Sequence, residues 1–552
     1  MEVVVVNAVV ETRSGRVQGR ESGGVVSFHG VPYAAAPEGA RRFLPPIEPE
    51  PWGGIREATH AGPASPQFSL PAFSWINAAA GALGQDCLNL NVWTPELDGA
   101  MRPVLVWIHG GGFLVGSGAT PVYNGEDLAR RGNAVVVTLN YRLGGMGFAH
   151  FGLLPRSLVG EGFEGATNLG LRDQIAALEW VRDNIERFGG DPGNVTVFGE
   201  SAGGMSVGSL LGSPKARDLF HRAICQSGAA DHVLDQEEAV QVTETFLRGL
   251  GVSDPTPEKL GELPIDWVLT VQRELMMRHS NMRNLMVMLP TVDGDVIPRQ
   301  PLEALRQGEA AHIPIMTGAN LEEWKLFRVM DQGLGRFREP DLLDRFREVL
   351  PGLPHAPRID SAVRRFREAL GERSAAKTPA EVWCAFQTAR TFHHPSHRLA
   401  EAQHAGGGHA YQYIFTWRAP ALPRALGACH AIEIPFVFGS VSHPIARPLT
   451  GLSPRARKLS RRIQHAWIGF ARAGRPGHER LPSWPAYDPE RRSTLMLGRE
   501  CALAERPFEA ERVLLDHWLG DAPVRGRPDG RRRRSGAPER SSWIGARAFG
   551  GA

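Results

Sequence analysis

The chain has 552 residues, of which 42% are hydrophobic and 22% charged, and its formal net charge is +3. These proportions are those of an ordinary soluble globular protein, and the absence of a long apolar run excludes a membrane-spanning protein. The five cysteines are scattered and include no Cys-x-x-Cys pair, so we expect neither a disulfide framework nor a cysteine-based zinc site.

The positive charge belongs to the C-terminal end of the chain. Residues 525–552 contain eight arginines against two carboxylates, so this segment carries +6 and the remainder −3. We expect one folded domain over residues 1–520 and a basic, disordered tail over residues 521–552, solvated rather than bound to nucleic acid or a membrane. The N-terminal segment, with Glu2 and no basic region, is not typical of a signal peptide, which favours a cytoplasmic protein.

Buried strands and amphipathic helices alternate along the chain. The pattern predicts a hairpin over residues 9–19, strands over 104–108, 134–139, 194–198 and 222–226, and a helix over 169–188. Such alternation predicts an α/β fold, with a mostly parallel sheet covered by helices on both faces. Reactive groups are then expected on loops at the carboxyl ends of the strands.

The segment Gly199-Glu200-Ser201-Ala202-Gly203 has the Gly-x-Ser-x-Gly form of a nucleophile elbow. A second match, around Ser206, follows at once. The strand predicted over residues 194–198 leads directly into the first match, and a helix can begin after it. That context predicts a strained turn that exposes the Ser201 hydroxyl, whereas Ser206 is expected to pack inside the helix.

A glycine-rich loop, His109-Gly110-Gly111-Gly112-Phe113, follows the strand predicted over residues 104–108. Its His-Gly-Gly-Gly form is typical of loops that offer backbone N–H groups to a developing oxyanion. It is not a phosphate-binding loop, because no Lys-Ser or Lys-Thr pair follows it. A serine hydroxyl and such donors are together what acyl transfer requires.

Further motifs occur in an order that resembles type-B carboxylesterases of the α/β-hydrolase fold, the family of cholinesterases and bacterial para-nitrobenzyl esterases. The resemblance runs from about residue 9 to Trp518 and rests on residues 28–34, 42–46, 86–92, 140–142, 168–174 and 226–228 as well as the two loops. It implies a serine carboxylester hydrolase without cofactor or metal, acting on a small ester and water, as a monomer or weak homo-oligomer.

The resemblance also implies roles for individual residues. Segment 318–323 matches the one that carries the family's catalytic acid, which is Glu323 by alignment, although Glu322 is adjacent. Segment 427–436 matches the histidine segment and makes His430 the general base. The remaining implied residues are the oxyanion-hole donors Gly111, Gly112 and Ala202 and the supporting acids Glu200 and Glu433, of which Glu433 is equally typical of a buried structural acid.

Residues expected to line the substrate pocket are apolar: Phe68, Phe73, Trp75, Met286 and Met288. Each is also typical of plain hydrophobic core. Flexible methionines near the acyl group favour short to medium acyl esters, with bulky or aromatic alcohols. The same acyl-enzyme chemistry also fits carbamate or amide hydrolysis, or acyl transfer to an alcohol. A non-catalytic binding protein is the alternative from another class.

Two positions depart from the family pattern. In the family's secreted members, a disulfide ends at the cysteine that matches Cys87. Its partner would fall near residues 63–66, which contain no cysteine, so a free buried thiol is expected. Gln85 replaces the glutamate that pairs with the arginine matching Arg42, which leaves that salt bridge in doubt. Histidines 393, 394 and 397 lack accompanying carboxylates at ligand spacing, and we expect no metal there.

Overall fold

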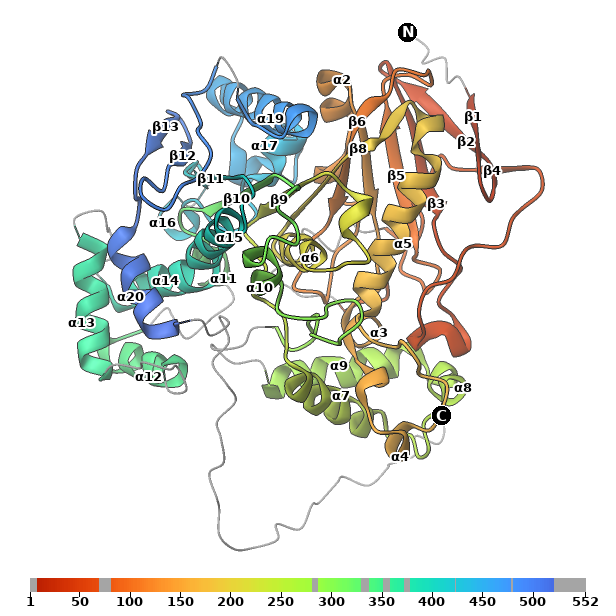
Figure 1. Cartoon of the computed structure of the whole chain (residues 1–552), viewed down its shortest axis with the longest axis horizontal. Helices are drawn as coiled ribbons and strands as arrows, with labels where there is room; N and C mark the ends of the chain where they lie inside the picture. Colours follow the sequence, from red (N-terminus) through yellow and green to blue (C-terminus); the bar gives the residue numbers. More distant parts are fainter. Residues whose placement is uncertain are drawn as a thin grey trace, which may run out of the picture.

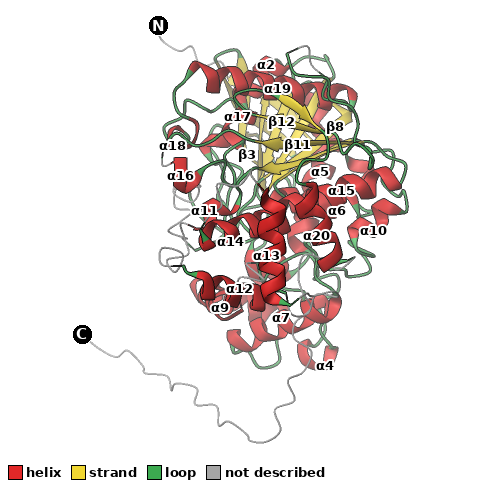
Figure 2. Ribbon diagram, turned by 90° about the vertical axis from the view of Figure 1, so that its left-hand side faces the viewer, coloured by secondary structure: helices red, strands yellow, loops and turns green. Residues whose placement is uncertain are grey.

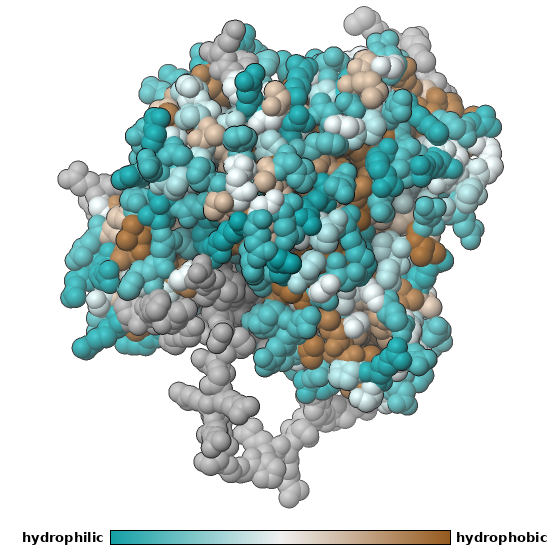
Figure 3. Space-filling view, viewed as in Figure 1, coloured by the Kyte–Doolittle hydropathy of each residue, from teal (hydrophilic) through white to brown (hydrophobic). Residues whose placement is uncertain are grey.

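The computed structural model describes residues 7–68, 81–279, 286–328, 337–350, 358–371, 378–421, 423–477 and 480–520. A single large sheet crosses the molecule, and helices cover both of its faces (Figures 1 and 2). No helix of the described residues is long and apolar enough to cross a membrane. In the view of Figure 3, hydrophilic residues cover most of the surface and apolar ones form small patches. The expected tail, residues 521–552, lies outside the described residues.

The sheet has the strand order β1-β2-β3-β5-β7-β6-β8-β9-β10-β11-β12-β13, with β4 paired to β2. From β7 to β12 all neighbouring strands are parallel, whereas the two ends of the sheet are antiparallel. The strands are β1 Asn7–Thr12, β2 Gly15–Ser22, β3 Val25–Pro32, β4 Ile55–Glu57, β5 Asn89–Thr94, β6 Arg102–Ile108, β7 Val135–Leu139, β8 Gly190–Glu200, β9 Arg222–Gln226, β10 Ile315–Asn320, β11 Ala410–Phe415, β12 Thr494–Leu497 and β13 Ala502–Ala504.

The helices connect the strands or follow them. They are α2 Glu126–Gly132, α3 Gly144–Phe148, α4 Arg156–Val159, α5 Leu169–Asn184, α6 Ala202–Leu211, α7 Gln236–Leu250, α8 Pro257–Glu262, α9 Ile265–His279, α10 Pro301–Arg306, α11 Trp324–Arg328, α12 Glu339–Val349, α13 Ile359–Leu370, α14 Pro379–Thr388, α15 His394–Ala405, α16 Pro423–Leu426, α17 Ile434–Phe438, α18 Arg447–Thr450, α19 Pro454–Ala473 and α20 Glu509–Leu519.

Alternate residues of β6 belong to two different hydrophobic cores. Val104, Val106 and Ile108 join the core that contains the apolar sides of α5 and α6. Leu105 and Trp107 join the core that contains α2, α17 and α19. Because side chains alternate across a strand, this division places α5 and α6 on one face of the sheet and α2, α17 and α19 on the other. A separate helical cluster holds α12, α13, α14 and α20 together.

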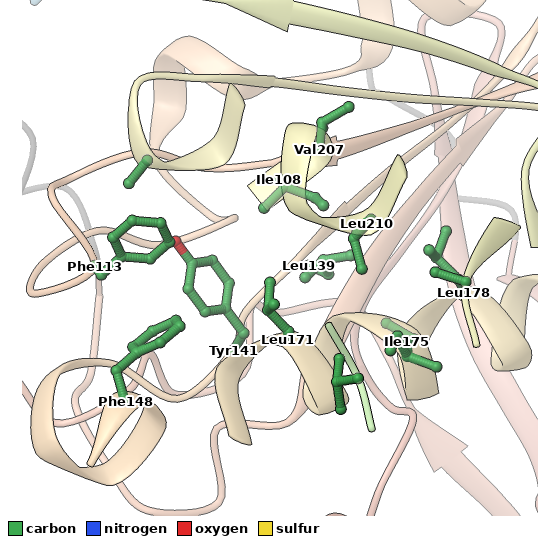
Figure 4. Close-up of a cluster of buried hydrophobic side chains, with 14 of the residues drawn as sticks. Ile108, Phe113, Leu139, Tyr141, Phe148, Leu171, Ile175, Leu178, Val207 and Leu210 are labelled. Carbon is green, nitrogen blue, oxygen red and sulfur yellow. The ribbon is translucent and has the colours of Figure 1, made fainter. Parts of the chain in front are cut away.

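The first of these cores packs directly beneath the glycine-rich loop. Figure 4 shows Phe113 of that loop near Tyr141 and Phe148, with Leu171 from α5 and Leu210 from α6 further along the same cluster. The rings of Phe113 and Phe148 meet edge to face with 4.8 Å between their centroids. All five of these side chains are buried, so the loop rests on a packed apolar floor.

The predicted elements are present, and several of their ends differ by a few residues. The hairpin is formed by β1 and β2, and the helix predicted over residues 169–188 begins at Leu169. Its α-helical part ends at Asn184 and continues as one 3₁₀ turn to Phe188, because Gly189 takes the left-handed conformation that closes the helix. Strand β8 begins at Gly190, earlier than predicted, where Gly190 pairs with Arg102 of β6.

Candidate active site

Ser201 stands between β8 and α6, with φ of 56° and ψ of −125°. A left-handed φ is strained for a residue with a side chain, and it turns the chain sharply from strand to helix. Gly203 makes this turn possible, because a Cβ there would lie 2.0 Å from the carbonyl oxygen of Ile108. Ser206 instead lies buried in α6, where its hydroxyl accepts a hydrogen bond from Gln174.

His430 and Glu323 meet on the loops that follow β11 and β10. The carboxylate Oε2 of Glu323 lies 2.7 Å from His430 Nδ1, and both side chains are buried. The other oxygen, Oε1, accepts hydrogen bonds from the Ser227 hydroxyl and the Asn320 amide, each at 2.6 Å. Glu323 is therefore held at three points, and one of them orients the imidazole.

The adjacent Glu322 points elsewhere. It forms ion pairs with Lys325 at 2.6 Å and with Arg418 at 3.3 Å, and it accepts the amide of Ala428. Of the two neighbouring glutamates, only Glu323 contacts the histidine.

The amides of Gly111, Gly112 and Ala202 are the oxyanion-hole donors predicted from the sequence. Gly111 and Gly112 have φ of 114° and 65°, and Ala202 is the first residue of α6. Among the described residues, none of these three N–H groups donates to a protein acceptor. The loop is fixed further on, where Gln67 exchanges hydrogen bonds with both backbone groups of Gly116.

Two more buried acids surround the histidine. Oε1 of Glu200 lies 3.1 Å from His430 Nε2, on the opposite side of the ring from Glu323. Burial lowers the pKa of His430, but the charges of Glu200 and Glu323 outweigh it and raise the pKa to about 9. Burial also raises the pKa of Glu200 well above its usual value, against the influence of His430. Glu433 accepts hydrogen bonds from Gln226 and Asn320 and does not touch the ring directly.

Comparison with known proteins places this geometry in a family. A model of the carboxylesterase family matches residues 6–514. This chain belongs to the carboxylesterase family. It is 36% identical over 508 residues to the para-nitrobenzyl esterase of Bacillus subtilis (strain 168), covering 92% of this chain and 98% of that protein. It is 34% identical over 512 residues to the phenmedipham hydrolase of Pseudarthrobacter oxydans, covering 91% and 97%.

Solved structures agree with these relatives. The carboxylesterase EST55 of Geobacillus stearothermophilus at pH 6.2 superposes with a TM-score of 0.81 at 39% identity, over 92% of this chain and 99% of that one. The para-nitrobenzyl esterase structure gives a TM-score of 0.77 at 35% identity. The predicted α/β-hydrolase fold and the family are thereby confirmed, and the chain is an enzyme that hydrolyses carboxylic esters.

The expected pocket residues of this carboxylesterase do not share one environment. Met286 is partly buried and stands next to the glycine-rich loop, since a Cβ on Gly112 would lie 3.9 Å from Met286 Cγ. Met288 has no exposed surface and packs within the main core. Phe68 is half-buried, while residues 73 and 75, the expected Phe73 and Trp75, lie outside the described residues.

Sequence reasoning missed several side chains that touch the proposed site. Ser227 and Asn320 hold Glu323, and Gln67 holds the glycine-rich loop. Phe327 and Phe392 lie beside the His430 ring, with centroids 5.1 and 4.9 Å from it. A signal existed for Ser227 and Asn320, because Ser227 follows β9, the neighbour of β8, and Asn320 ends β10, the next parallel strand. No comparable signal marks Gln67 or the two phenylalanines.

The two departures from the family pattern have structural outcomes in the carboxylesterase. Arg42 Nε donates a hydrogen bond of 2.6 Å to Gln85 Oε1, which replaces the ion pair of the family pattern. Cys87 is a free, buried thiol, as predicted. A separate ion pair, between Arg142 and Asp173, is fully buried, with 2.6 Å between its charged atoms.

The three histidines near residue 393 have structural partners. His393 faces the carbonyl oxygen of Asn320, His394 the carboxylate of Asp516 and His397 the side chain of Gln412. Within the described ranges, no group of three His, Cys, Asp or Glu side chains is arranged to hold a metal ion.

Proposed function

We propose that Ser201 is the nucleophile, His430 the general base and Glu323 the orienting acid of this carboxylesterase. The observation that carries the proposal is the 2.7 Å contact between Glu323 and His430 Nδ1, which leaves Nε2 on the side of the ring facing the end of β8. A serine hydroxyl is a poor nucleophile at neutral pH, so His430 Nε2 takes its proton as Oγ attacks the ester carbonyl. Glu323 holds the reactive tautomer and stabilises the imidazolium.

The negative oxygen that forms in this attack needs donors already in place. We assign that role to the amides of Gly111, Gly112 and Ala202, which have no competing protein acceptor. Each such donor is worth about 3 kcal/mol of transition-state stabilisation. The alcohol then leaves with the proton from His430, and water attacks the acyl-Ser201 ester with His430 again as base.

Glu200 and Glu433 act in support. The Glu200 carboxylate is adjacent to Nε2, the nitrogen that gains the proton, so it favours the imidazolium form. Glu433 acts at a distance by fixing Asn320, whose backbone amide binds Glu323. Neither Glu200 nor Glu433 contacts both Ser201 and the oxyanion-hole amides. We therefore propose both as positioning residues.

The substrate class follows from the apolar neighbours of the site. We propose esters of short to medium acyl chains with bulky or aromatic alcohols. Met286 beside Gly112 supports a flexible apolar wall close to the reacting carbonyl. A relative named para-nitrobenzyl esterase supports an aromatic alcohol. Phe68 is proposed for the pocket lining, whereas the packing of Met288 in the core gives it a supporting part only.

The test is hydrolysis of a series of nitrophenyl esters by the purified full chain and by Ser201→Ala. Removal of the nucleophile reduces kcat by about 10⁶-fold, and labelling by a fluorophosphonate probe disappears with it. Ser206→Ala is the matched control and retains both. Equal turnover by Ser201→Ala and the parent chain would end the assignment, and a rate maximum at palmitate would end the proposed acyl range.

We also propose a cytoplasmic location and a monomer or weak homo-oligomer. Five free cysteines, four of them buried, support a reducing compartment. Fractionation of cells for the location and light scattering on purified protein for the mass test these two proposals.

A further inference from the structure

Helix α19 carries a dense set of cations near its N-terminal end. Arg455, Arg457, Lys458 and Arg461 are exposed and Arg462 is half-buried. Within the described ranges, none of these five side chains has a carboxylate at ion-pair distance. The Nε atom of Arg462 is buried without a hydrogen-bond partner.

These cations line two adjoining hollows in the surface. The larger, of about 1250 Å³, is bordered by α19, by the segment after β11 and by the turn between β12 and β13. The smaller, of about 760 Å³, is bordered by the first turns of α19 and by Arg480. Lys458 and Arg462 belong to both linings, so the two hollows adjoin. Together the linings hold one carboxylate, Glu500, and eight cations: Arg418, Arg455, Arg457, Lys458, Arg461, Arg462, Arg480 and Arg499.

The arrangement is unfavourable for an isolated helix. The first turn of α19 contains no acidic residue, although the N-terminal end of a helix favours negative charge. Arg455 and Lys458 are three residues apart, and Lys458 and Arg462 four apart, so like charges face each other. In α2, by contrast, Arg130 and Arg131 both pair with Asp127. An anion bound beside α19 would offset the repulsion between these cations.

We propose that the adjoining hollows beside α19 bind a ligand that carries several phosphate groups. Guanidinium groups bind phosphate oxygens through paired, charge-assisted hydrogen bonds, which suits a site built mainly of arginine. From Arg455 to Arg462 the helix rises about 10 Å, too far for one phosphate to contact both ends. A chain of linked phosphates, or neighbouring phospholipid headgroups, has the required spread of charge. The site is separate from Ser201, and the proposal stands without the proposed mechanism.

The experiment measures binding of tripolyphosphate to the full chain by calorimetry, and of vesicles containing phosphatidylglycerol by co-sedimentation. The test variant is Arg455→Gln/Lys458→Gln/Arg462→Gln. Its control, Arg364→Gln/Arg365→Gln/Arg367→Gln, removes the same charge from exposed positions of α13, where Arg367 has a carboxylate partner. Both variants keep the arginine-rich C-terminal segment, so any binding by that segment contributes equally to each.

We expect the α19 variant to bind at least about tenfold more weakly than the parent chain, and the α13 variant within about twofold, with binding weakened by salt. If the α19 substitutions weaken binding of tripolyphosphate, the ligand is a soluble polyphosphate. If they weaken binding of the vesicles alone, the ligand is a lipid headgroup. Equal binding by the α19 and α13 variants, or no binding of either probe by the parent chain, overturns the proposal.

Cys501 supplies an independent readout. It borders the larger hollow and is the only partly exposed cysteine of the five. Bound tripolyphosphate slows its reaction with a thiol reagent in the parent chain and in the α13 variant, but not in the α19 variant. Because the cations of α19 repel one another when no ligand is bound, the α19 variant has an equal or higher Tm without ligand. A lower Tm together with unchanged thiol protection contradicts the site.

Discussion

Replacing Glu323 by glutamine tests the most specific feature of the proposed mechanism, and Glu322→Gln is a control one residue away. Glu323 Oε1 accepts two hydrogen bonds, from Ser227 and Asn320, whereas Oε2 faces His430 Nδ1. In the amide, the single carbonyl oxygen must take the Oε1 position to satisfy both donors. The NH₂ group then faces Nδ1.

That exchange selects the wrong form of the imidazole. Nδ1 must now accept a hydrogen bond, so the proton moves to Nε2, and His430 can no longer take the proton of Ser201. Loss of the correct tautomer reduces kcat by about 10⁴-fold, equivalent to about 5 kcal/mol of transition-state stabilisation. Glu322→Gln weakens the pairs with Lys325 and Arg418, neither of which contacts His430, so we expect kcat to fall by about fivefold or less.

The assay is the burst and steady-state release of nitrophenol from nitrophenyl butyrate, with thermal unfolding of each variant recorded alongside. We expect Glu323→Gln to fold with a Tm near that of the parent chain and to lose both acylation and turnover. Equal losses in the two variants, or full activity of Glu323→Gln, would refute the assignment of Glu323 as the acid that orients His430.

Four further predictions concern the site and the residues that support it. Gly203→Ala lowers the free energy of unfolding by at least about 2 kcal/mol, because its Cβ would lie 2.0 Å from a carbonyl oxygen of β6. The control Gly99→Ala places its Cβ in open space and leaves the midpoint of chemical denaturation unchanged. Glu200→Gln lowers the pKa of His430 from about 9, so the rising limb of kcat/KM moves to lower pH; an unmoved limb contradicts this. The same raised pKa means that protonated His430 stabilises the fold below pH 6.5 and that this stabilisation is lost as pH rises to about 9. Asp173→Asn costs about 3–5 kcal/mol in urea unfolding, because its arginine partner stays buried without a counter-charge, and a loss below about 1 kcal/mol would exclude this.

Local features of the sequence predict the nucleophile turn well. Strand β8, Ser201 and α6 are contiguous, and each glycine that the turn requires is visible in the sequence. The same holds for the buried strands, whose runs of Val and Ile pack on both faces. Contacts between distant segments are less accessible to prediction. Gln67 reaches Gly116 across 49 residues, and no pattern near either residue indicates that pair.

The choice between Glu322 and Glu323 illustrates the limit. Adjacent residues at the end of a strand face different directions, and composition cannot say which one faces the histidine loop. Two backbone hydrogen bonds fix the register: the amide of Glu322 donates to Ala428 and that of His430 donates to Glu323. Only family resemblance favours Glu323 from the sequence, and the side-chain geometry agrees with it.

The order of the strands explains why a histidine has to stand between the other two groups. Ser201 follows β8 and Glu323 follows β10, with β9 between them, so the two strand ends are about 10 Å apart. No hydrogen bond spans that distance, but an imidazole carries one nitrogen on each side. The loop after β11 must therefore return over β10, which the positive φ of Ala431 and the immediate start of α17 accomplish. With β9 in this place, a histidine from the loop after β11 fits between the two strand ends, which agrees with the proposed chain order Ser201, Glu323, His430.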